Sequence, residues 1–405
     1  MEEVLVMILI ATALFPPEPV VSAKIASDLT THLAHKYQVT AISPKPTRPY
    51  GLQFNKGIEP TSYKHIVLDS YTYPKSGVLG RLWESFSLGR HIAEYIERNH
   101  ESIEVVYANV WPLFAQYFLA RVCKKFGIPF VIHVQDIYPE SLTSKVPIFG
   151  HLLKAMLLPM DRYSLVNAAS VISISNQMRD SLISTRHLDV ERVHVVRNWQ
   201  DDSLFQKVAG YESADDNKQD DFVFLYLGSI SPSAGVELLI HAFAYADLSD
   251  ARLVIAGGGS DKRKCMRIAN SYNMSNIEFI DASPDQVPVM QAQADILLLP
   301  LKKGIAATAL PSKMTAYMFS AKPIIASVDE PSEVAHIIRS NKCGWVTPPE
   351  NIKELARVMQ QAYSTPSDDL LVLSKNSLEF ANVNLTQASN LRKLAQVVEN
   401  CRRVE

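Results

Sequence analysis

The chain has 405 residues, of which 47% are hydrophobic and 20% are charged. One hydrophobic core rarely serves so long a chain, so we expect two globular domains, and the composition excludes a disordered protein. With 40 basic and 42 acidic residues the net charge is −2, which argues against general nucleic-acid binding.

The first apolar run, residues 4–15, follows Glu2 and Glu3 and not a basic segment, and it is too short to span a bilayer. We interpret it as the buried first strand of a parallel sheet. No other run predicts a transmembrane helix. Four widely spaced cysteines predict neither a disulfide framework nor a zinc site, and they fit a reducing compartment, so we expect a cytoplasmic protein.

Short apolar runs then alternate with helix-length segments, and this pattern occurs twice along the chain. It predicts βαβ units and two doubly wound parallel sheets, which makes the fold class α/β with two Rossmann-like domains. In the first half we expect strands near residues 4–10, 37–43, 65–68, 104–108, 129–134, 170–174 and 193–196. In the second half we expect them near residues 222–227, 252–256, 276–280, 295–300, 322–327 and 344–347.

A polar and acidic stretch, residues 207–221, separates the two sets of strands. We interpret it as a linker between an N-terminal domain, residues 1–206, and a C-terminal domain, residues 222–375. The tail, residues 376–405, has a helical pattern. Ligands of doubly wound sheets bind at the carboxyl ends of the strands, so two such domains are expected to face each other across a binding cleft.

Two glycine-containing turns in the second half follow predicted strands. The first runs from Gly228 and Ser229 to Gly235, where a helix opens, and its backbone N–H groups suit a phosphate. The second, residues 257–259, is a run of three glycines that allows close approach of the backbone. Neither turn matches a Walker loop or a dinucleotide fingerprint, so an ordinary strand-to-helix turn is the alternative for both.

A third turn in the second half opens a helix with Pro311, Ser312 and Lys313. Proline favours the first helical positions and serine is a good cap, but a lysine there opposes the helix dipole by about 0.3–1 kcal/mol. A charge-assisted hydrogen bond to an anion is worth about 1.5–3 kcal/mol. We therefore predict that Lys313 binds a diphosphate, with a solvated lysine as the alternative.

Polar side chains also gather after a strand of the first half, in the sequence HVQDIYPES. His133 and Asp136 are titratable groups at a strand end, which makes them functional candidates. A buried, hydrogen-bonded structural histidine is the alternative. The proline-rich loop after the first strand, residues 14–29, should reach the same cleft, and Ser22 within it starts a helix.

Taken in order, the motifs of the chain resemble glycosyltransferase family 4 over nearly its whole length. They are SAKIA, HVQDIYPES, VISIS, VRNW, YLGSI, GVELLI, VIAGGG, PSK and KPIIA. The narrower resemblance is to bacterial capsule and O-antigen sugar transferases, which include the N-acetyl-fucosamine transferase type. It implies the GT-B fold, an acceptor-binding N-terminal half, a C-terminal half that binds a nucleotide diphosphate sugar, and a last helix, within residues 376–405, that crosses back to the N-terminal domain.

The residues and the resemblance together define a candidate site. Catalytic roles are expected for His133, Asp136 and Lys313. Donor binding is expected of Gly228, Ser229, Gly235, Ser312, Lys313 and, through the nucleotide ribose, Glu333, although a surface helix carboxylate is the alternative for the last. Acceptor binding is expected of Pro17, Glu18, Ser22, Tyr138 and Glu140.

The chain departs from the pattern of the family. The usual arginine and lysine of the first glycine turn are replaced by Ser229 and Ala234, and the paired glutamates would fall at Thr308 and Ala316. The branch with a PSK turn also tends to lack parts of this pattern. Without these family residues, we expect the diphosphate to be bound by Lys313, by Ser312 and by the backbone amides of residues 228–235.

We therefore expect a retaining transfer, without a metal or other cofactor, from a UDP-linked N-acetylated sugar to a hydroxyl of a lipid-linked saccharide. A UDP-sugar epimerase of the same fold and a non-catalytic subunit that binds a nucleotide sugar are the alternatives. Two segments, residues 77–96 and 146–163, combine apolar and basic side chains and could contact the inner membrane. Ordinary core-facing helices show the same pattern.

Overall fold

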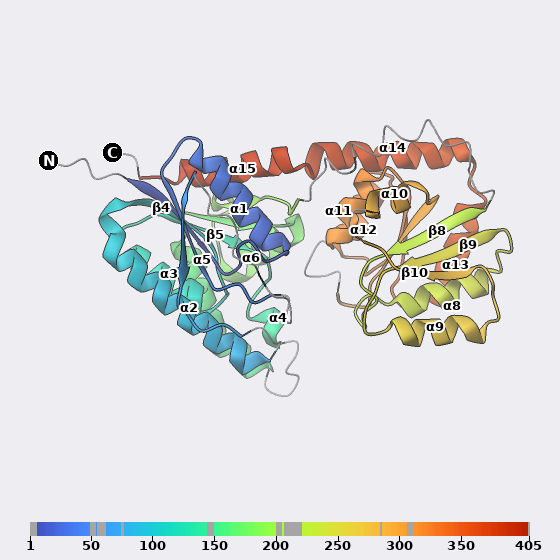
Figure 1. The fold of residues 1–405 in the computed structure, drawn as a ribbon, viewed down its shortest axis with the longest axis horizontal. Helices are drawn as coiled ribbons and strands as arrows, with labels where there is room; N and C mark the ends of the chain where they lie inside the picture. Colours follow the sequence, from blue (N-terminus) through green and yellow to red (C-terminus); the bar gives the residue numbers. More distant parts are fainter. Residues whose placement is uncertain are drawn as a thin grey trace. The chain divides into compact units, whose positions relative to one another are not determined.

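The computed structural model describes residues 6–48, 54, 62–73, 77–143, 150–199, 205, 221–283, 286–305 and 311–403. The chain divides into two compact units (Figure 1). Unit 1 comprises Met1–Asn198 and Ala388–Glu405, and unit 2 comprises Trp199–Gln387. Of the predicted linker, residues 207–221, only Asp221 lies within the described ranges.

Seven parallel strands form the sheet of unit 1, in the order β3-β2-β1-β4-β5-β6-β7. All residues of β1 and β2 are buried, because both faces of the sheet are covered at its centre. The first apolar run is therefore a buried strand, as predicted. The strands are β1 (Met7–Thr12), β2 (Val39–Pro44), β3 (Lys64–Leu68), β4 (Ile103–Asn109), β5 (Phe130–Val134), β6 (Ser170–Ser173) and β7 (Val193–Val195).

Helices cover both faces of this sheet. Connections between parallel strands are right-handed, so helices that lead in opposite directions along the sheet lie on opposite faces. α1 leads from β1 to β2, whereas α2, α3, α5 and α6 lead toward β7, and α3 contacts both α2 and α5. The helices are α1 (Val21–Ala34), α2 (Val78–Asn99), α3 (Phe114–Lys125), α4 (Glu140–Thr143), α5 (Gly150–Asn167) and α6 (Asn176–Arg186), with short 3-10 turns at His100–Ser102 and Val190–Arg192.

The last helix of the chain, α15 (Gln387–Asn400), packs on unit 1. Leu394 and Val398 on this helix are fully buried. Beyond its end, Arg402 forms an ion pair with Glu104 of β4. The preceding helix, α14 (Ser367–Asn384), belongs to unit 2, so the segment that returns to unit 1 begins later than residue 376.

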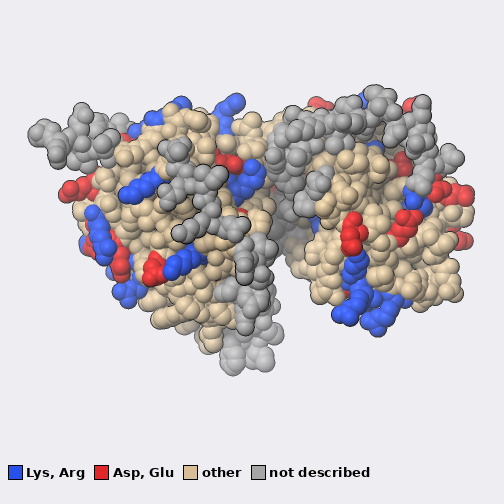
Figure 2. All heavy atoms as spheres, viewed as in Figure 1, with Lys and Arg blue, Asp and Glu red and all other residues tan. Residues whose placement is uncertain are grey.

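Six parallel strands form the sheet of unit 2, in the order β10-β9-β8-β11-β12-β13. They are β8 (Phe222–Leu227), β9 (Ala251–Ala256), β10 (Ile277–Ile280), β11 (Ile296–Pro300), β12 (Ile324–Ser327) and β13 (Gly344–Thr347). The helices are α8 (Val236–Ala246), α9 (Lys262–Ser271), α10 (Val287–Ala292), α11 (Ser312–Phe319), α12 (Glu333–Ser340), α13 (Ile352–Tyr363) and α14. On the face shown in Figure 2, basic and acidic side chains are interspersed over both units, in keeping with the net charge of −2.

Each sheet has one point at which the connections change direction, between β1 and β4 in unit 1 and between β8 and β11 in unit 2. Loops that leave the carboxyl ends of two such strands part toward opposite faces, and ligands of doubly wound sheets bind where they part. Ligands are therefore expected to bind at the loops after β8 and β11 in unit 2, or at those after β1 and β4 in unit 1.

Candidate functional site

The loops after β8 and β9 are joined beyond the ends of their strands. The Ile230 N–H donates to the Gly258 carbonyl oxygen of the second loop at 2.8 Å, and the Gly228 N–H donates at 2.9 Å to the carbonyl oxygen of Ala256, the last residue of β9. A Cβ on Gly257 would lie 2.3 Å from the Gly228 carbonyl oxygen, and a Cβ on Gly259 would lie 2.2 Å from that of Ile230. Two of the three glycines are thus required by the packing of the loops, and the Gly228 amide, expected to bind phosphate, is already occupied.

Lys313 lies across the end of β8. Its Nζ donates a hydrogen bond to Tyr226 Oη at 2.7 Å, and this hydroxyl donates in turn to the Ser229 carbonyl oxygen at 2.6 Å. Gly228 has a φ of 142°, and a Cβ there would lie 2.2 Å from Lys313 Cε. Only glycine allows the lysine side chain to pass at this point. Because Lys313 follows β11, its ammonium group lies at the point where the connections of the unit 2 sheet change direction.

The ammonium group of Lys313 is half-buried, and no carboxylate in the described ranges forms an ion pair with it. Burial lowers the pKa of Lys313 to about 8. A partly desolvated cation without a counter-charge is unfavourable in the folded chain, and such groups concentrate at functional sites. The geometry is that of a site for an anion.

The helix that follows β8 adds a second feature for anion binding. α8 begins at Val236, and Gly235 at its N-cap position provides no side-chain hydrogen bond. In the described part of the chain, no hydrogen bond engages the N–H groups of Ser229 and Gly235. These amides and the positive end of the α8 dipole remain for a ligand.

A second lysine, Lys302, lies beside the start of α8, and the sequence analysis did not find it. It follows β11, and its Nζ pairs at 2.8 Å with Glu237 in the first turn of α8. Its backbone N–H donates to the Ser233 carbonyl oxygen at 3.2 Å. The signal for Lys302 in the sequence was its place two residues after the predicted strand.

The start of α11 differs from the prediction. Pro311 occupies the N-cap position with an extended backbone (φ −62°, ψ 134°), so Ser312 is the first helical residue and not the cap. The side chain of Ser312 lies outside the described atoms. Ala316 is buried in the core of unit 2, and Thr308, the other position expected for the acidic pair, lies outside the described residues.

Glu333 begins α12, after the loop that follows β12. It is 7% exposed, which excludes the surface carboxylate that was its alternative interpretation. β12 is the neighbour of β11, so Glu333 comes from the same edge of the sheet as Lys313. Within the residues described, no group of three or more His, Cys, Asp and Glu side chains could hold a metal ion.

Comparison with known proteins assigns both units. Residues 22–199 match the model of the glycosyl transferase 4-like domain, and residues 212–379 match that of the glycosyl transferases group 1. The chain is a glycosyltransferase. It is 25% identical over 299 residues to the putative colanic acid biosynthesis glycosyl transferase WcaI of Escherichia coli K12, which covers 69% of this chain and 70% of WcaI. The probable glycosyltransferase WbjE of Pseudomonas aeruginosa is 20% identical, over 67% of this chain and 68% of WbjE.

Solved structures confirm the predicted fold of the glycosyltransferase. The structure of Anabaena HepE in complex with UDP matches with a TM-score of 0.69 and 15% identity, over 98% of this chain and 100% of HepE. WaaG, a glycosyltransferase involved in lipopolysaccharide biosynthesis, matches with a TM-score of 0.62 and 15% identity, over 96% of this chain and 99% of WaaG. The glycosyltransferase therefore has the GT-B fold of two Rossmann-like domains.

In unit 1 of the glycosyltransferase, His133 is the penultimate residue of β5, and it is buried. Its Nδ1 lies 2.7 Å from Tyr107 Oη, and the Gln135 amide donates to its Nε2 at 3.0 Å. Gln135 accepts in turn from Asn198 at 2.9 Å. Burial lowers the pKa of His133 to about 3, so the imidazole is neutral near pH 7. Its geometry suits it to orient Gln135 and not to exchange a proton.

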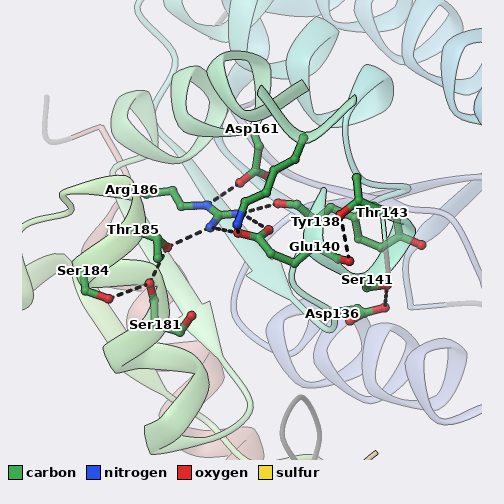
Figure 3. A network of polar contacts seen from close by, with 11 residues as sticks. Asp136, Tyr138, Glu140, Ser141, Thr143, Asp161, Ser181, Ser184, Thr185 and Arg186 are labelled. Carbon is green, nitrogen blue, oxygen red and sulfur yellow. Dashed lines mark hydrogen bonds and ion pairs between the residues drawn. The ribbon is translucent and has the colours of Figure 1, made fainter. Parts of the chain in front are cut away.

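The loop after β5 is anchored by Arg186, which is fully buried (Figure 3). The guanidinium donates to Asp161 at 2.9 Å, to both carboxylate oxygens of Glu140 at 2.8 and 2.7 Å, and to the Tyr138 carbonyl oxygen. Burial alone would raise the pKa of Glu140, but the Arg186 hydrogen bonds outweigh it and lower that pKa to about 2. Glu140 and the Tyr138 backbone thus hold the loop in place.

Asp136 lies at the exposed tip of this anchored loop. Its Oδ2 accepts a hydrogen bond from Ser141 Oγ at 2.6 Å. In Figure 3 the Asp136–Ser141 pair lies apart from the side chains that contact Arg186. The loop therefore presents an accessible carboxylate on a fixed support, whereas the other carboxylate of the motif, Glu140, is engaged.

The loop after β1 contains the other residues expected to bind an acceptor. Glu18 is buried, and its Oε1 accepts from the N–H groups of Thr47 and Arg48 at 2.9 and 2.8 Å, which joins this loop to the one after β2. Pro17 is exposed. Ser22 lies in the first turn of α1, which begins one residue earlier than predicted.

Polar groups without partners lie after β4, on the other side of the unit 1 switch point. Trp111 Nε1 and Gln116 Oε1 are buried, and neither has a hydrogen-bond partner within the described ranges. The Arg48 guanidinium stacks over the Trp111 ring at 4.2 Å and pairs with Glu84 at 2.5 Å. Sequence reasoning missed this group, because the pattern ANVWPLF carries no titratable residue to draw attention to it.

Proposed function

We propose that this glycosyltransferase transfers a sugar from a UDP-linked, N-acetylated sugar to a hydroxyl of a lipid-linked saccharide in capsule or O-antigen synthesis, with retention of anomeric configuration. The names of WcaI, a colanic acid enzyme, and of WaaG, a lipopolysaccharide enzyme, support this class of acceptor. The UDP bound in HepE supports this class of donor.

The observation that carries the proposal is the ammonium group of Lys313 over Gly228, which has no carboxylate partner among the described residues. When the bond between the anomeric carbon and the phosphate oxygen breaks, negative charge develops on the departing diphosphate. A fixed cation and the N-terminus of α8 stabilise this charge without reorganisation, which lowers the barrier. Because these groups supply positive charge at the leaving group, we propose that transfer needs no metal.

The acceptor would bind at the switch point of unit 1. The buried donors and acceptors of Trp111 and Gln116 need partners, and the hydroxyl groups of a saccharide supply both kinds of hydrogen bond. Asp136, accessible on its anchored loop, is the carboxylate that would meet the acceptor hydroxyl.

Binding of UDP by calorimetry and transfer to a lipid-linked acceptor test the donor site. We expect Lys313→Ala to weaken UDP binding by about tenfold to a hundredfold, the equivalent of the lost charge-assisted hydrogen bonds, and to lower turnover by orders of magnitude. Lys353→Ala, which removes an exposed lysine of α13, is the matched control. Unchanged turnover in Lys313→Ala would refute the assigned role.

Product analysis separates the proposal from its alternatives. Incubation with a panel of UDP-, GDP- and dTDP-sugars, with and without acceptor, should give a new glycoside only when acceptor is present. A changed sugar without acceptor would show epimerase activity, and binding without any product would show a non-catalytic subunit. Transfer that persists in excess EDTA is expected, and its loss would contradict metal independence.

A further inference from the structure

Helix α5 of unit 1 presents apolar side chains to solvent. Leu152, Met156 and Val166 are 72%, 65% and 40% exposed. Ala155 and Pro159 are exposed as well. The spacing of three and four residues places these side chains along one face of the helix. The opposite face carries Leu157, Asp161, Ser164 and Leu165, which are all buried. An ordinary surface helix is polar on its outer face, so this helix is unusual.

Helix α2 adds two exposed apolar side chains near its start. Leu79 and Trp83 are 83% and 59% exposed, and their spacing of four residues places them on one face. The Trp83 ring stacks on Phe86 at 5.3 Å, and Phe86 meets Phe118 of α3 edge-on at 5.3 Å. The indole is therefore held in place at the surface by aromatic contacts beneath it.

The exposed residues of the two helices flank one small apolar cluster. Leu82 of α2 packs against this cluster together with Leu153 of α5, and Leu157 of α5 lies within it. α3 contacts both helices. We call the group Leu79, Trp83, Leu152, Ala155, Met156 and Pro159 the α2–α5 surface.

The charged groups of these helix ends favour an anionic partner. Arg162 of α5 is exposed, and the Lys154 side chain, which pairs with Glu140, is 40% exposed, whereas the one acidic residue of this helix, Asp161, is buried against Arg186. Glu84, the acidic residue of the first turns of α2, is also buried, against Arg48 and Arg81. Apolar side chains bordered by cations and by no exposed carboxylate of these segments match the boundary of an anionic bilayer.

We propose that the α2–α5 surface binds an anionic lipid bilayer, with its apolar side chains at the level of the headgroups and its basic groups on the phosphates. α2 and α5 begin where the chain leaves the carboxyl ends of β3 and β5, so the surface lies at the sheet edge that carries the proposed acceptor site. The inference rests on the proposed function for the lipid-linked acceptor, but binding itself is measured without any transfer. No helix in the described ranges is long and apolar enough to cross a bilayer.

Flotation of the full chain with vesicles tests the surface. We expect binding to phosphatidylcholine vesicles that contain phosphatidylglycerol, weaker binding to phosphatidylcholine alone, and a decrease with added salt. Leu152→Glu with Met156→Glu should lower the partition coefficient by at least about tenfold, since two apolar side chains leave the interface. Leu371→Glu with Val383→Glu, at 52% and 63% exposed positions of unit 2, is the matched control.

A second measurement follows the indole. Fluorescence quenching by brominated acyl chains is expected in the wild type and should fall in Trp83→Phe, whereas Trp345→Phe, in the other unit, should keep it. If the double glutamate variant melts at a lower temperature, Leu79→Ser at its 83% exposed position repeats the flotation test.

The outcomes separate this inference from the proposed function. Lys313→Ala should float like the wild type while failing to transfer sugar. Flotation that is unchanged in the surface variants, or equally lost in the unit 2 control, overturns the membrane surface. So does a surface that proves to bind a second copy of the chain, seen as a concentration-dependent dimer that the glutamates abolish without any vesicle binding. Transfer that fails in every variant and in the wild type overturns the proposed function alone.

Discussion

Lys313 carries a charge that its own chain does not balance within the described residues. Its hydrogen-bond partner, Tyr226 Oη, is neutral, and burial is the cause of its lowered pKa. In the folded chain the charged form is therefore disfavoured until an anion arrives. Binding of an anion raises the pKa of Lys313 back toward its ordinary value. Where the lysine was neutral before binding, it takes up a proton when the anion binds.

This linkage predicts a pH dependence of donor binding. With a folded-state pKa of about 8, Lys313 is charged at neutral pH, and UDP affinity should fall as pH rises through that value, by up to about tenfold per pH unit. Calorimetry across this range should also show proton uptake above the pKa. Lys313→Arg, whose charge persists, should flatten the profile. An unaltered slope in that variant would contradict the assignment.

Lys313 also makes the stability of the ligand-free fold depend on pH, but this stability rises with pH, whereas the affinity for UDP falls. Folding lowers the pKa of Lys313 from its ordinary 10.5, so between about 8 and 10.5 the unfolded chain binds more protons. Stability without ligand therefore gains from this group as pH rises through that window, and the cost is fully present below it. The ligand-free and UDP-bound enzymes should therefore differ in how their stability depends on pH.

The sequence pointed to candidate residues where their type was unusual for their place. Lys313 became a candidate because a cation at a helix start is unfavourable, and His133 because it lies near the end of a strand. Lys302 and Trp111 were missed, because their roles depend on which strands are neighbours in the sheet. Arg186 is far from Glu140 in the sequence, so no local pattern could show that Glu140 is an anchor.

At the scale of elements, the loop after β8 is fixed by a contact between glycine and lysine. Gly228→Ala should weaken UDP binding and destabilise unit 2 by about 1–3 kcal/mol, because its φ of 142° is strained for alanine and the new Cβ meets Lys313 Cε. Urea unfolding and calorimetry measure both effects. Gly258→Ala is the internal control, since a Cβ there has nothing within 4 Å. Equal effects of the two substitutions would show that the contact is unimportant.

The Arg186 network makes a second prediction at this scale. Arg186→Met would leave the buried Asp161 and the half-buried Glu140 without their shared cation, at a cost of about 3–5 kcal/mol. Thermal or urea unfolding of unit 1 should show this loss. Arg179→Met on the same helix removes an exposed arginine paired only at the surface, and it should change stability by no more than about 0.5 kcal/mol.

The elements themselves were almost fully predictable. The thirteen strands of the two sheets lie within a few residues of their predicted positions, because the central strands are buried on both faces and are continuous apolar runs. The prediction that Ser312 caps α11 was wrong, since a proline can adopt the extended N-cap conformation as well as a position in the first helical turn. Such one-residue choices depend on how the preceding loop enters the helix.

At the scale of the whole molecule, the two ends of the chain belong to the same unit. A chain that ends at Gln387 would lose α15 and leave the sites of Leu394 and Val398 open, each worth about 1.5–3 kcal/mol of burial. We expect faster hydrogen exchange in β4 and β6 of unit 1, which contact the C-terminal segment, and unchanged exchange in unit 2. UDP binding by unit 2 should persist. Faster exchange throughout both units would contradict this division.

The position of α15 also bears on how the chain is made. Unit 2 is one continuous segment, so all its residues are joined before the residues that complete unit 1. Unit 1 must wait, with part of its core uncovered, until translation ends. Unit 1 therefore cannot complete its core first, in contrast to the usual order in which N-terminal domains fold first.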